Sequence, residues 1–523
     1  MSKTTQNGIN HKLWDSINFL RGPIGLNEYK NYILSLLFFK YISDVWVDVN
    51  EEYKTRYATE EDTKSSMDLE RFVLDDDCTF NYISQYSKNP DIGERINQAL
   101  LKVELLNSDK LGGVFRNVDF KRLGDSLDKN KRLEKLFQIF NHDEFDFRPS
   151  ISGHETRAQK AFSYLIEQFA MMLGKVSGDF HTPQEVSRLL GKLLSPKVGS
   201  SIYDPSCGSG SLLLSLANEV KDKEGNISKD FSLYGQETIT DIFAICKMNL
   251  CLHGLDENSS NIKFGNTITN PSHIEREKLK EFDIAIANPP FSLHWDDLIG
   301  KEDYLGRFER GVPPRSKADY AFILHTIESL KENGRMGIIM PHGVLFRGST
   351  EGKIRRKLIE ENLLEAVIGL PANLFYGTGI PVVILIFNKA KGTNTDILFI
   401  DASEKHELGR KQNKLIATNI DEIVEIYEAF RNGVDFNSSK YKPLVDKFAR
   451  RVPFQEVIDN DFNLNIPRYV DTSEDIPPVD VLGVQQEIDI LEKELLEVKV
   501  KMKEYLNRLT LIQVNNHPQR RWL

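Results

Sequence analysis

Hydrophobic residues at helical spacing dominate the first part of the chain. Leu13, Ile17 and Leu20 recur on one face, Arg21-Gly22-Pro23 interrupts the pattern, and a more apolar helix is predicted from Glu28 to about Val49. The sequence from there to about Phe140 is charged and mostly helical in pattern, and Asn141–Asp146 is predicted to be a linker. The predicted core residues of this stretch are Phe72, Leu74, Ile83, Ile96, Leu100, Leu101, Leu105 and Leu106. We therefore expect an all-helical N-terminal domain over residues 1–145, which serves packing or interaction and carries no catalytic group.

Beyond residue 146 the pattern changes to helices that alternate with short apolar runs. Amphipathic helices are predicted at Thr156–Leu173, Gln184–Leu194, Ser211–Val220, Thr240–Leu252 and Ile420–Phe430, and another begins at Asp319. Strands are predicted at Ser201–Asp204, Leu233–Glu237, Phe282–Ala287, Leu364–Pro371 and Ile380–Asn388. A strand with its following loop is predicted at Ile262–Thr267, and a turn that leads into a strand at Gly334–Pro341. Such alternation is typical of a parallel sheet covered by helices. The expected fold class is α/β, with a Rossmann-like domain over residues 146–475.

An apolar stripe also runs along the C-terminal tail, which Pro477-Pro478 separates from the preceding domain. Its members follow one another at alternating spacings of four and three, which predicts a coiled-coil helix over residues 476–523. They are Val484, Ile488, Leu491, Leu495, Val498, Met502, Tyr505 and Leu509. A lone helix cannot bury such a stripe by itself. The helix either folds back on the chain's own α/β domain or pairs with helices of another subunit, and we favour the second interpretation.

The composition is that of an ordinary globular protein, with 523 residues of which 40% are hydrophobic and 28% charged. The formal charge is −10, from 67 basic and 77 acidic residues, whereas an autonomous binder of duplex DNA usually has a basic excess. If DNA is the substrate, a local patch or a partner subunit must supply most phosphate contacts. The four cysteines form no CxxC pair and no metal-ligand cluster, and no signal peptide or apolar run of membrane-spanning length is recognised. We expect a cytoplasmic protein with no metal site and no membrane contact.

The most informative turn follows the apolar run Phe282–Ala287, which is predicted to be a buried strand. In the turn Asn288-Pro289-Pro290-Phe291, each proline fixes φ and removes an N–H, and the residue before a proline is pushed out of the helical region. The turn presents the Asn288 amide and the following carbonyl as two fixed acceptors beside an aromatic ring. Two acceptors suit the exocyclic amino group of a base that has left its stack, because they localise the nitrogen lone pair for attack on an electrophile. A structural turn at a sheet edge is the alternative interpretation.

A glycine-containing turn comes earlier, between a predicted strand and a predicted helix. In Asp204-Pro205-Ser206-Cys207-Gly208-Ser209-Gly210 the glycines let the backbone approach a ligand closely, as in nucleotide-binding first loops. The turn lacks the third glycine of the dinucleotide fingerprint and the Gly-Lys-Ser/Thr of a phosphate loop. An acid here would repel a pyrophosphate and attract a cation. Asp204 therefore favours S-adenosylmethionine, with its sulfonium and amino groups, over NAD or ATP.

Three further features are candidates for the same ligand. Glu237 ends the second predicted strand, where an acid usually accepts from ribose hydroxyls, and Asn266 follows the third strand, near the expected position of the cofactor adenine. Gly178-Asp179-Phe180-His181-Thr182-Pro183 leads into a helix whose first N–H groups suit an anionic or carboxylate-bearing ligand. Because the carboxyl ends of parallel strands share one edge of a sheet, the cofactor and Asn288 would face each other.

With these motifs in this order, the chain resembles the DNA adenine-N6 methyltransferases and, more narrowly, the modification (M) subunit of type I restriction–modification systems. Gly-x-Phe-x-Thr-Pro, Asp-Pro-x-x-Gly-Ser-Gly and Asn-Pro-Pro-Phe follow that family's order, and Phe19–Gly22 and Glu28–Asp44 resemble parts of its N-terminal helical domain. Two positions depart from the family's pattern. His181 stands where the family often has an aromatic or other residue, and Asn266 stands where an acid is common. Both departures concern the cofactor pocket and leave the transfer chemistry untouched.

The resemblance implies a Rossmann-like S-adenosylmethionine-dependent methyltransferase domain, preceded by an all-helical domain and followed by a coiled-coil helix. It implies that residues 178–183, Gly208–Gly210 and Glu237 bind S-adenosylmethionine, while Asn288, Pro289 and Phe291 hold an adenine flipped out of double-stranded DNA. It also implies three kinds of protein partner: a DNA-specificity (S) subunit that selects the site, a second copy of the M subunit, and a restriction (R) subunit.

Other classes of protein fit these motifs less well. A cytosine-C5 methyltransferase needs a Pro-Cys nucleophile, and no cysteine here follows a proline. Asp204 and the missing third glycine argue against a NAD dehydrogenase. Two alternatives stay open at this point: a methyltransferase that acts on a glutamine side chain or on an RNA guanine through the same Asn-Pro-Pro turn, and a non-catalytic assembly subunit of the same fold.

Overall fold

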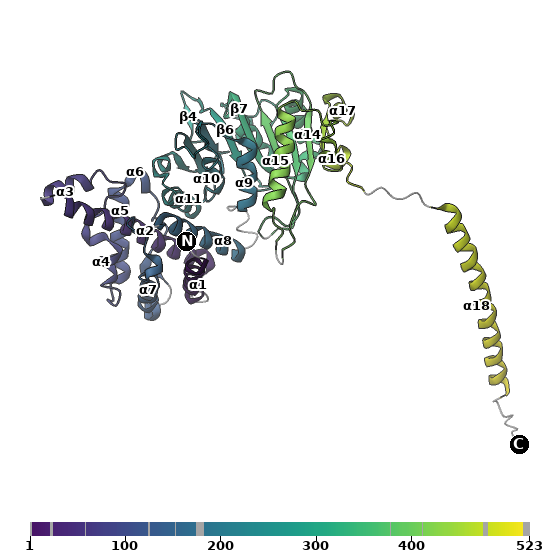
Figure 1. The fold of residues 1–523 in the computed structure, drawn as a ribbon, viewed down its shortest axis with the longest axis horizontal. Helices are drawn as coiled ribbons and strands as arrows, with labels where there is room; N and C mark the ends of the chain where they lie inside the picture. Colours follow the sequence, from purple (N-terminus) through teal and green to yellow (C-terminus); the bar gives the residue numbers. More distant parts are fainter. Residues whose placement is uncertain are drawn as a thin grey trace. The chain divides into compact units, whose positions relative to one another are not determined.

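The computed structural model describes residues 3–20, 25–57, 59–123, 126–151, 153–173, 182–376, 378–409, 412–473 and 480–515. The chain forms two compact units, Met1–Asp471 and Thr472–Leu523. The predicted fold class is confirmed, because helices are followed by an α/β domain with a mostly parallel sheet and then by a final helix (Figure 1).

The N-terminal part is built from helices and short 3-10 segments. The α-helices are α1 (Lys3–Leu20), α2 (Leu26–Arg56), α3 (Glu60–Met67), α4 (Phe80–Ser84), α5 (Ile92–Leu106), α6 (Ser108–Leu111), α7 (Ser126–Phe140) and α8 (His154–Leu173). The 3-10 segments are η1 (Asp76–Cys78), η2 (Phe120–Arg122) and η3 (Asp143–Phe145). The predicted break at Arg21-Gly22-Pro23 lies outside the described residues. Helix α2 is apolar on all sides over most of its length and is correspondingly buried against its neighbours.

For three residues of α5 the prediction that they lie in the core was wrong. Leu101, Leu105 and Leu106 are 59%, 67% and 42% exposed, because α5 turns its other face to the core. That buried face carries Ile92, Ile96, Ala99, Leu100 and Val103 at helical spacing. The remaining predicted core residues, Phe72, Leu74, Ile83, Ile96 and Leu100, are buried as expected.

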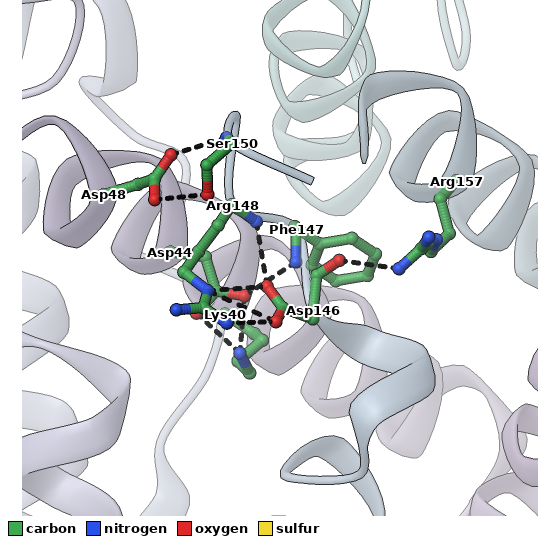
Figure 2. Close-up of polar contacts among 8 residues, drawn as sticks. All are labelled: Lys40, Asp44, Asp48, Asp146, Phe147, Arg148, Ser150 and Arg157. Atoms are coloured by element: carbon green, nitrogen blue, oxygen red, sulfur yellow. Dashed lines mark hydrogen bonds and ion pairs between the residues drawn. The ribbon is translucent and has the colours of Figure 1, made fainter. Parts of the chain in front are cut away.

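The segment between α7 and α8 begins with the predicted linker Asn141–Asp146 and is fastened to α2 just beyond it (Figure 2). Phe147 is fully buried in the helical core, and its N–H donates to Asp44 Oδ2 over 2.9 Å. Asp44 also accepts from the buried ammonium of Lys40, one turn earlier in α2. One turn later, Asp48 accepts from the N–H and the hydroxyl of Ser150, at 2.6 and 2.7 Å. We call residues 141–150 the strap, because side chains of α2 hold this segment in one place.

The α/β domain contains a sheet of nine strands in the order β11-β10-β8-β9-β7-β6-β1-β2-β3. The strands are β1 (Ser201–Asp204), β2 (Ser232–Glu237), β3 (Ile262–Phe264), β6 (Phe282–Ala287), β7 (Leu330–Pro341), β8 (Leu364–Gly369), β9 (Val382–Asn388), β10 (Ile397–Asp401) and β11 (Ala449–Val452), and a separate hairpin pairs β4 (Ile274–Glu275) with β5 (Lys278–Leu279). β3, β2, β1, β6 and β7 are mutually parallel. β9 is antiparallel to both β7 and β8, and β11 is antiparallel to β10. Strands β10 and β11 were not predicted.

Helices cover both faces of this sheet (Figure 1). The α-helices are α9 (Gln184–Leu194), α10 (Ser211–Ala217), α11 (Thr240–Leu252), α12 (Asp297–Lys301), α13 (Asp319–Glu328), α14 (Ser349–Glu360), α15 (Ala417–Arg431), α16 (Lys442–Val445) and α17 (Phe454–Asp459). Short 3-10 segments lie at η5 (Asp256–Asn261), η6 (His342–Leu345) and η7 (Ile466–Arg468). Alternate side chains of β6 enter opposite cores: Ile284 and Ile286 pack with α9, α10 and α15, whereas Ala285 and Ala287 pack with α13 and α14.

Helix α11 belongs to both parts of the first unit. Ile242 and Ile245 lie in the core of the N-terminal helices, whereas Phe243 and Cys246 lie in a core of the α/β domain. The Lys247 ammonium reaches across to the N-terminal part and donates to the Gly112 carbonyl over 2.9 Å. A helix that is apolar on all sides must be covered on all sides, and here two different groups of elements provide that cover.

The second unit contains one long helix, α18 (Val481–Asn515). The described side chains of its predicted stripe, from Val484 to Tyr505, are between 43% and 64% exposed, while the Leu509 side chain lies outside the described part. The stripe therefore lies on a single continuous helix, which cannot bury it by itself. None of the helices in the described part of the chain combines the length and apolar character that crossing a bilayer requires.

Candidate functional site

Parallel pairing brings the predicted site residues to one edge of the sheet. Asp204 ends β1, Glu237 ends β2, and Asn288 follows β6 directly. β1 lies between β2 and β6, with Tyr203 opposite both Tyr234 and Ala285. The glycine-containing turn and the Asn-Pro-Pro-Phe turn therefore leave neighbouring strands on the same side, as the sequence predicted.

The glycine-containing turn adopts a conformation that most side chains would strain. Gly208 and Gly210 have φ values of 53° and 78°, in the left-handed region that glycine tolerates. A Cβ at Gly210 would also lie 3.0 Å from Cys246 Sγ of α11. The Ser209 side chain is buried, and its hydroxyl has no hydrogen-bond partner among the described residues. The turn thus has no side chain at Gly208 and Gly210 that would keep a ligand away from its backbone. It also contains a buried hydroxyl, that of Ser209, which a ligand could bind.

Two buried carboxyl groups flank this turn. Asp204 is fully buried, and burial raises its pKa to about 8; the hydrogen bond from Ser206 N opposes this shift and the nearby Glu237 carboxylate adds to it. Asp204 Oδ1 accepts from Ser206 N over 2.9 Å, whereas Oδ2 has no partner within the described chain. An acidic pair with an unused oxygen favours a cationic ligand over an anionic one.

Glu237 is tied to the glycine-containing turn by its own hydrogen bonds. Its Oε2 accepts from Gly208 N over 3.0 Å and its Oε1 from Ile239 N over 2.8 Å. Burial raises the pKa of Glu237, and these N–H groups partly oppose the shift. The carboxylate thus shapes the turn directly, and its remaining lone pairs are available to a hydroxyl-bearing ligand.

Asn266 lies in an exposed turn after β3, close to the end of β2. Gly265 N donates to the Glu237 carbonyl over 2.9 Å, which fixes the start of this turn. Asn266 Oδ1 accepts from the N–H groups of Ile268 and Thr269, at 2.9 and 3.2 Å. Since its oxygen closes the turn, Asn266 can offer only its amide N–H groups to a ligand.

The first predicted motif is described only at its end. Gly178, Asp179, Phe180 and His181 lie outside the described residues. Thr182 and Pro183 precede α9 and are buried. The structure brings Thr182 to the Asn-Pro-Pro-Phe turn: Asn288 Nδ2 donates to Thr182 Oγ1 over 2.9 Å.

The Asn-Pro-Pro-Phe turn holds two acceptors that no described residue uses. Asn288 is 9% exposed, and Pro289 is buried beside it. Among the described residues, none donates a hydrogen bond to Asn288 Oδ1 or to the Pro289 carbonyl. Pro290 has no N–H that could close the turn on itself. The turn therefore presents the two oxygens that the sequence analysis expected.

Two residues that the sequence analysis missed support this turn. Ser292, just after it, has a φ of 53°, and its N–H donates to Asp319 Oδ1 over 2.8 Å, from the first residue of α13. The other oxygen of Asp319 pairs with Arg347. Phe375, in the connection after β8, meets the half-buried Phe291 ring edge-on, with centroids 6.4 Å apart. An acid at the first position of a predicted helix was the only signal for Asp319, and Phe375 gave none.

Comparisons with known proteins agree with this architecture. The family described as N-6 DNA Methylase matches residues 157–476, and the HsdM N-terminal domain matches residues 9–140. The type I restriction enzyme MpnII methylase subunit of Mycoplasma pneumoniae is 27% identical to this chain, and the alignment covers 98% of both. The type I restriction enzyme MjaVII methylase subunit of Methanocaldococcus jannaschii is 32% identical over 90% of this chain and 79% of its own length.

A solved structure is similar over almost the whole chain. The type I restriction-modification system methyltransferase subunit from Streptococcus thermophilus matches with a TM-score of 0.77 and 31% identity, covering 90% of this chain and 100% of its own. A second solved structure comes from work on complex assembly and conformational transition of the type I R-M system. It matches this chain with a TM-score of 0.64 at 20% identity, which shows the same fold.

Proposed function

Because the chain belongs to the N-6 DNA methylase family, as a methylase subunit of the type I restriction–modification kind and thus a DNA methyltransferase, we propose that it methylates N6 of an adenine flipped out of double-stranded DNA. The methyl donor in this proposal is S-adenosylmethionine. The observation that carries it is the pair of unused acceptors, Asn288 Oδ1 and the Pro289 carbonyl, on the strand next to an acidic glycine-containing turn.

The two acceptors would compensate for the low nucleophilicity of the adenine amino group. The N6 lone pair of adenine is delocalised into the ring, so the amino group is a poor nucleophile. Oxygens that accept both of its hydrogens localise that lone pair and aim it in one direction. The same oxygens stabilise the positive charge that develops on N6 as the new C–N bond forms, and prolines hold the turn in place beforehand.

The residues of the glycine-containing turn fit S-adenosylmethionine, which supplies an electrophilic methyl group on a sulfonium cation. The carboxyl groups of Asp204 and Glu237 suit its positive charges. The Ser209 hydroxyl, which has no hydrogen-bond partner in the described part of the chain, would bind it as well. Gly208 and Gly210 give it close access to the backbone. Glu237 remains our candidate for the ribose hydroxyls, and Asn266 for the adenine ring, to which it would donate. In this proposal Pro183 completes the cofactor-binding set, together with Gly178, Asp179, Phe180 and His181, which lie outside the described residues. The sequence analysis placed Thr182 in the same set.

Phe291 is our candidate for stacking on the flipped base. Its ring is half-buried and in T-shaped contact with Phe375, so contact with the protein restrains its orientation. Stacking of a base on an aromatic side chain contributes about 1–3 kcal/mol. This energy would offset part of the free energy needed to unstack the adenine.

The rest of the chain serves assembly in this proposal. Residues 1–145 form the N-terminal helical domain, residues 146–475 form the methyltransferase domain, and residues 476–523 pair with helices of a DNA-specificity (S) subunit. The net charge of −10 supports a division of labour, in which the partner supplies most contacts to DNA phosphates and reads the sequence. A second M subunit and a restriction (R) subunit complete the proposed complex.

The proposed function is tested by Asn288→Ala in the complex purified with its partner subunits. We expect N6-methyladenine formation to fall by about a hundredfold or more, since one preorganised acceptor is lost. Binding of S-adenosylmethionine, measured by calorimetry, should change little. Methylation at the wild-type rate by this variant would disprove the catalytic assignment.

A further inference from the structure

Thr182 was grouped with the cofactor-binding residues, but among the described residues its hydroxyl is hydrogen-bonded to the Asn-Pro-Pro-Phe turn. Its Oγ1 accepts from Asn288 Nδ2 over 2.9 Å, and both side chains are buried, at 4% and 9% exposure. Thr182 directly precedes Pro183 and α9, and Asn288 follows β6, so 106 positions of sequence separate the two partners. A buried side-chain hydrogen bond between two such distant segments fixes the relative position of both groups.

The orientation of the Asn288 amide decides whether the turn can activate an amino group. With Oδ1 toward the substrate, the amide and the Pro289 carbonyl form two acceptors for the two N6 hydrogens. With the amide reversed, its NH2 would face the NH2 of adenine, donor against donor. The two orientations have nearly the same shape, so packing alone does not distinguish them. A hydroxyl can accept from Nδ2 or donate to Oδ1. In this structure the Thr182 hydroxyl accepts from Nδ2, and this arrangement leaves Oδ1 for the substrate.

We propose that Thr182 is a positioning residue for the methyl transfer: its hydroxyl holds Asn288 Nδ2 and thereby keeps Oδ1 directed at the exocyclic amino group of the substrate. This inference rests on the proposed function and assigns Thr182 a role in base activation instead of cofactor affinity. The turn is then held from two sides, by Thr182 at Asn288 and by Asp319 at Ser292. Since the Pro289 carbonyl is fixed by the backbone, the amide is the only acceptor of the pair that needs such a restraint.

Two substitutions separate the hydroxyl from the shape of the side chain. Thr182→Val keeps the volume and removes the acceptor, and Thr182→Ser keeps the acceptor. In single-turnover assays of the assembled enzyme at saturating S-adenosylmethionine and DNA, Thr182→Val should lower the rate roughly tenfold or more, in keeping with the loss of one buried hydrogen bond. Thr182→Ser should recover most of that rate. The dissociation constant for S-adenosylmethionine should stay within about threefold of wild type in both variants, because neither change removes a charged contact.

Binding of modified DNA provides a readout that does not depend on turnover. The assembled enzyme, with S-adenosylhomocysteine bound, is compared on duplexes that carry adenine or purine at the target position; purine lacks the exocyclic amino group. Wild type should prefer adenine, and Thr182→Val should lose most of that preference while binding purine duplex as before. A purely structural effect would weaken both duplexes alike.

The outcomes distinguish this inference from the proposed function. Normal methylation by the Asn288→Ala variant would rule out the catalytic role of the turn and, with it, the proposed function. An inactive Asn288→Ala together with a fully active Thr182→Val leaves the proposed function standing and overturns the positioning role. A Thr182→Val enzyme with weak cofactor binding but a normal saturating rate also overturns it, since Thr182 would then belong to the cofactor site alone.

Discussion

Asp204 is a residue whose acid–base behaviour depends on where the fold puts it. At the buried end of β1, with one oxygen unpartnered in the described chain, its pKa is raised to about 8. Between the ordinary carboxyl pKa of 3.8 and about pH 8, the folded protein therefore keeps a proton that the unfolded chain has lost. The contribution of Asp204 to folding stability thus falls as the pH rises through this range. A bound cation would reverse the preference and release the proton.

We therefore predict that binding of S-adenosylmethionine is coupled to proton release. The affinity should rise with pH from about 6.5 towards 8, by at most about tenfold per pH unit, and level off above the raised pKa. Calorimetry in two buffers of different ionisation enthalpy measures the released proton. The ligand's own α-amino group titrates near pH 8, and burial also raises the pKa of Glu237. Asp204→Asn therefore serves as the control and should retain only the smaller dependence that these two groups cause. Identical proton release by Asp204→Asn and wild type would contradict the prediction.

Sequence alone identified those candidate site residues that stand in short, contiguous motifs. Asn288-Pro289-Pro290-Phe291 and the turn after Asp204 were recognised because a rigid turn or a glycine pair is local. The contact between Thr182 and Asn288 could not be predicted, since it joins segments far apart in the chain and depends on where α9 begins against β6. Asp319 was visible only as the start of a helix, although its carboxylate braces Ser292.

Among the elements, the pattern located the helices and parallel strands well and failed where burial depends on a neighbour. α9 and α11 begin and end at the predicted residues. β11 was missed, because its sequence, Ala449-Arg450-Arg451-Val452, has two charged residues at a sheet edge and little apolar alternation. Leu101 and Leu105 were placed in the core because the apolar residues of α5 extend beyond the face that α5 buries. Only the first part of the strap, Asn141–Asp146, was predicted as a linker; the hydrogen bonds of Phe147 and Ser150 to α2 lie beyond it and leave no periodic signal.

The strap provides a prediction about stability. Asp44 and Lys40 are 3% and 7% exposed, so Asp44→Ala leaves a buried ammonium without its carboxylate. We expect the free energy of unfolding to fall by about 3–5 kcal/mol, measured by urea denaturation. The double variant Lys40→Met/Asp44→Leu should lose clearly less, because no unpaired charge is left behind.

Asp48→Ala is the matched control for this test. It also removes contacts of α2 with the strap, but its loss involves two hydrogen bonds to Ser150 and no buried ion pair. A cost of about 1–2 kcal/mol is expected. Equal destabilisation by Asp44→Ala and Asp48→Ala would show that the buried charge is not the decisive factor.

On the scale of the whole molecule, the catalytic machinery and the proposed assembly element lie in different compact units. All proposed site residues belong to the first unit, whereas the apolar stripe lies on α18 of the second. The stripe was predicted from spacing alone, since a heptad pattern is legible without knowledge of any partner. The same pattern does not identify the partner helix, because many helices of suitable charge could pack against the stripe.

This separation leads to a prediction about truncation. Removal of residues 480–523 should leave a folded protein that binds S-adenosylmethionine with unchanged affinity, and that no longer co-purifies with its specificity subunit or methylates duplex DNA. Calorimetry, thermal unfolding and tandem purification measure these three properties. Co-purification of the truncated chain with the specificity subunit would contradict the role of α18.

Substitutions within α18 sharpen the same test. Leu491→Asp/Leu495→Asp places charges in the stripe and should reproduce the truncation. Ile490→Asp alters a residue of similar exposure that lies outside the stripe, so assembly should survive. Loss of assembly in both variants would mean that general apolar character, and not the heptad stripe, holds the subunits together.

The shared helix α11 has a consequence for how the protein is made. During synthesis the helices α1–α8 emerge from the ribosome first, but their core needs Ile242, Ile245 and Met248 of α11. The chain from the end of α8 at Leu173 to the end of α11 at Leu252 takes about 4–16 s to translate, at about 5–20 residues per second. For that interval the nascent helical domain has an open apolar side. Codon choice and chaperone occupancy between these two points should therefore govern the yield of soluble protein more strongly than they do elsewhere in the message.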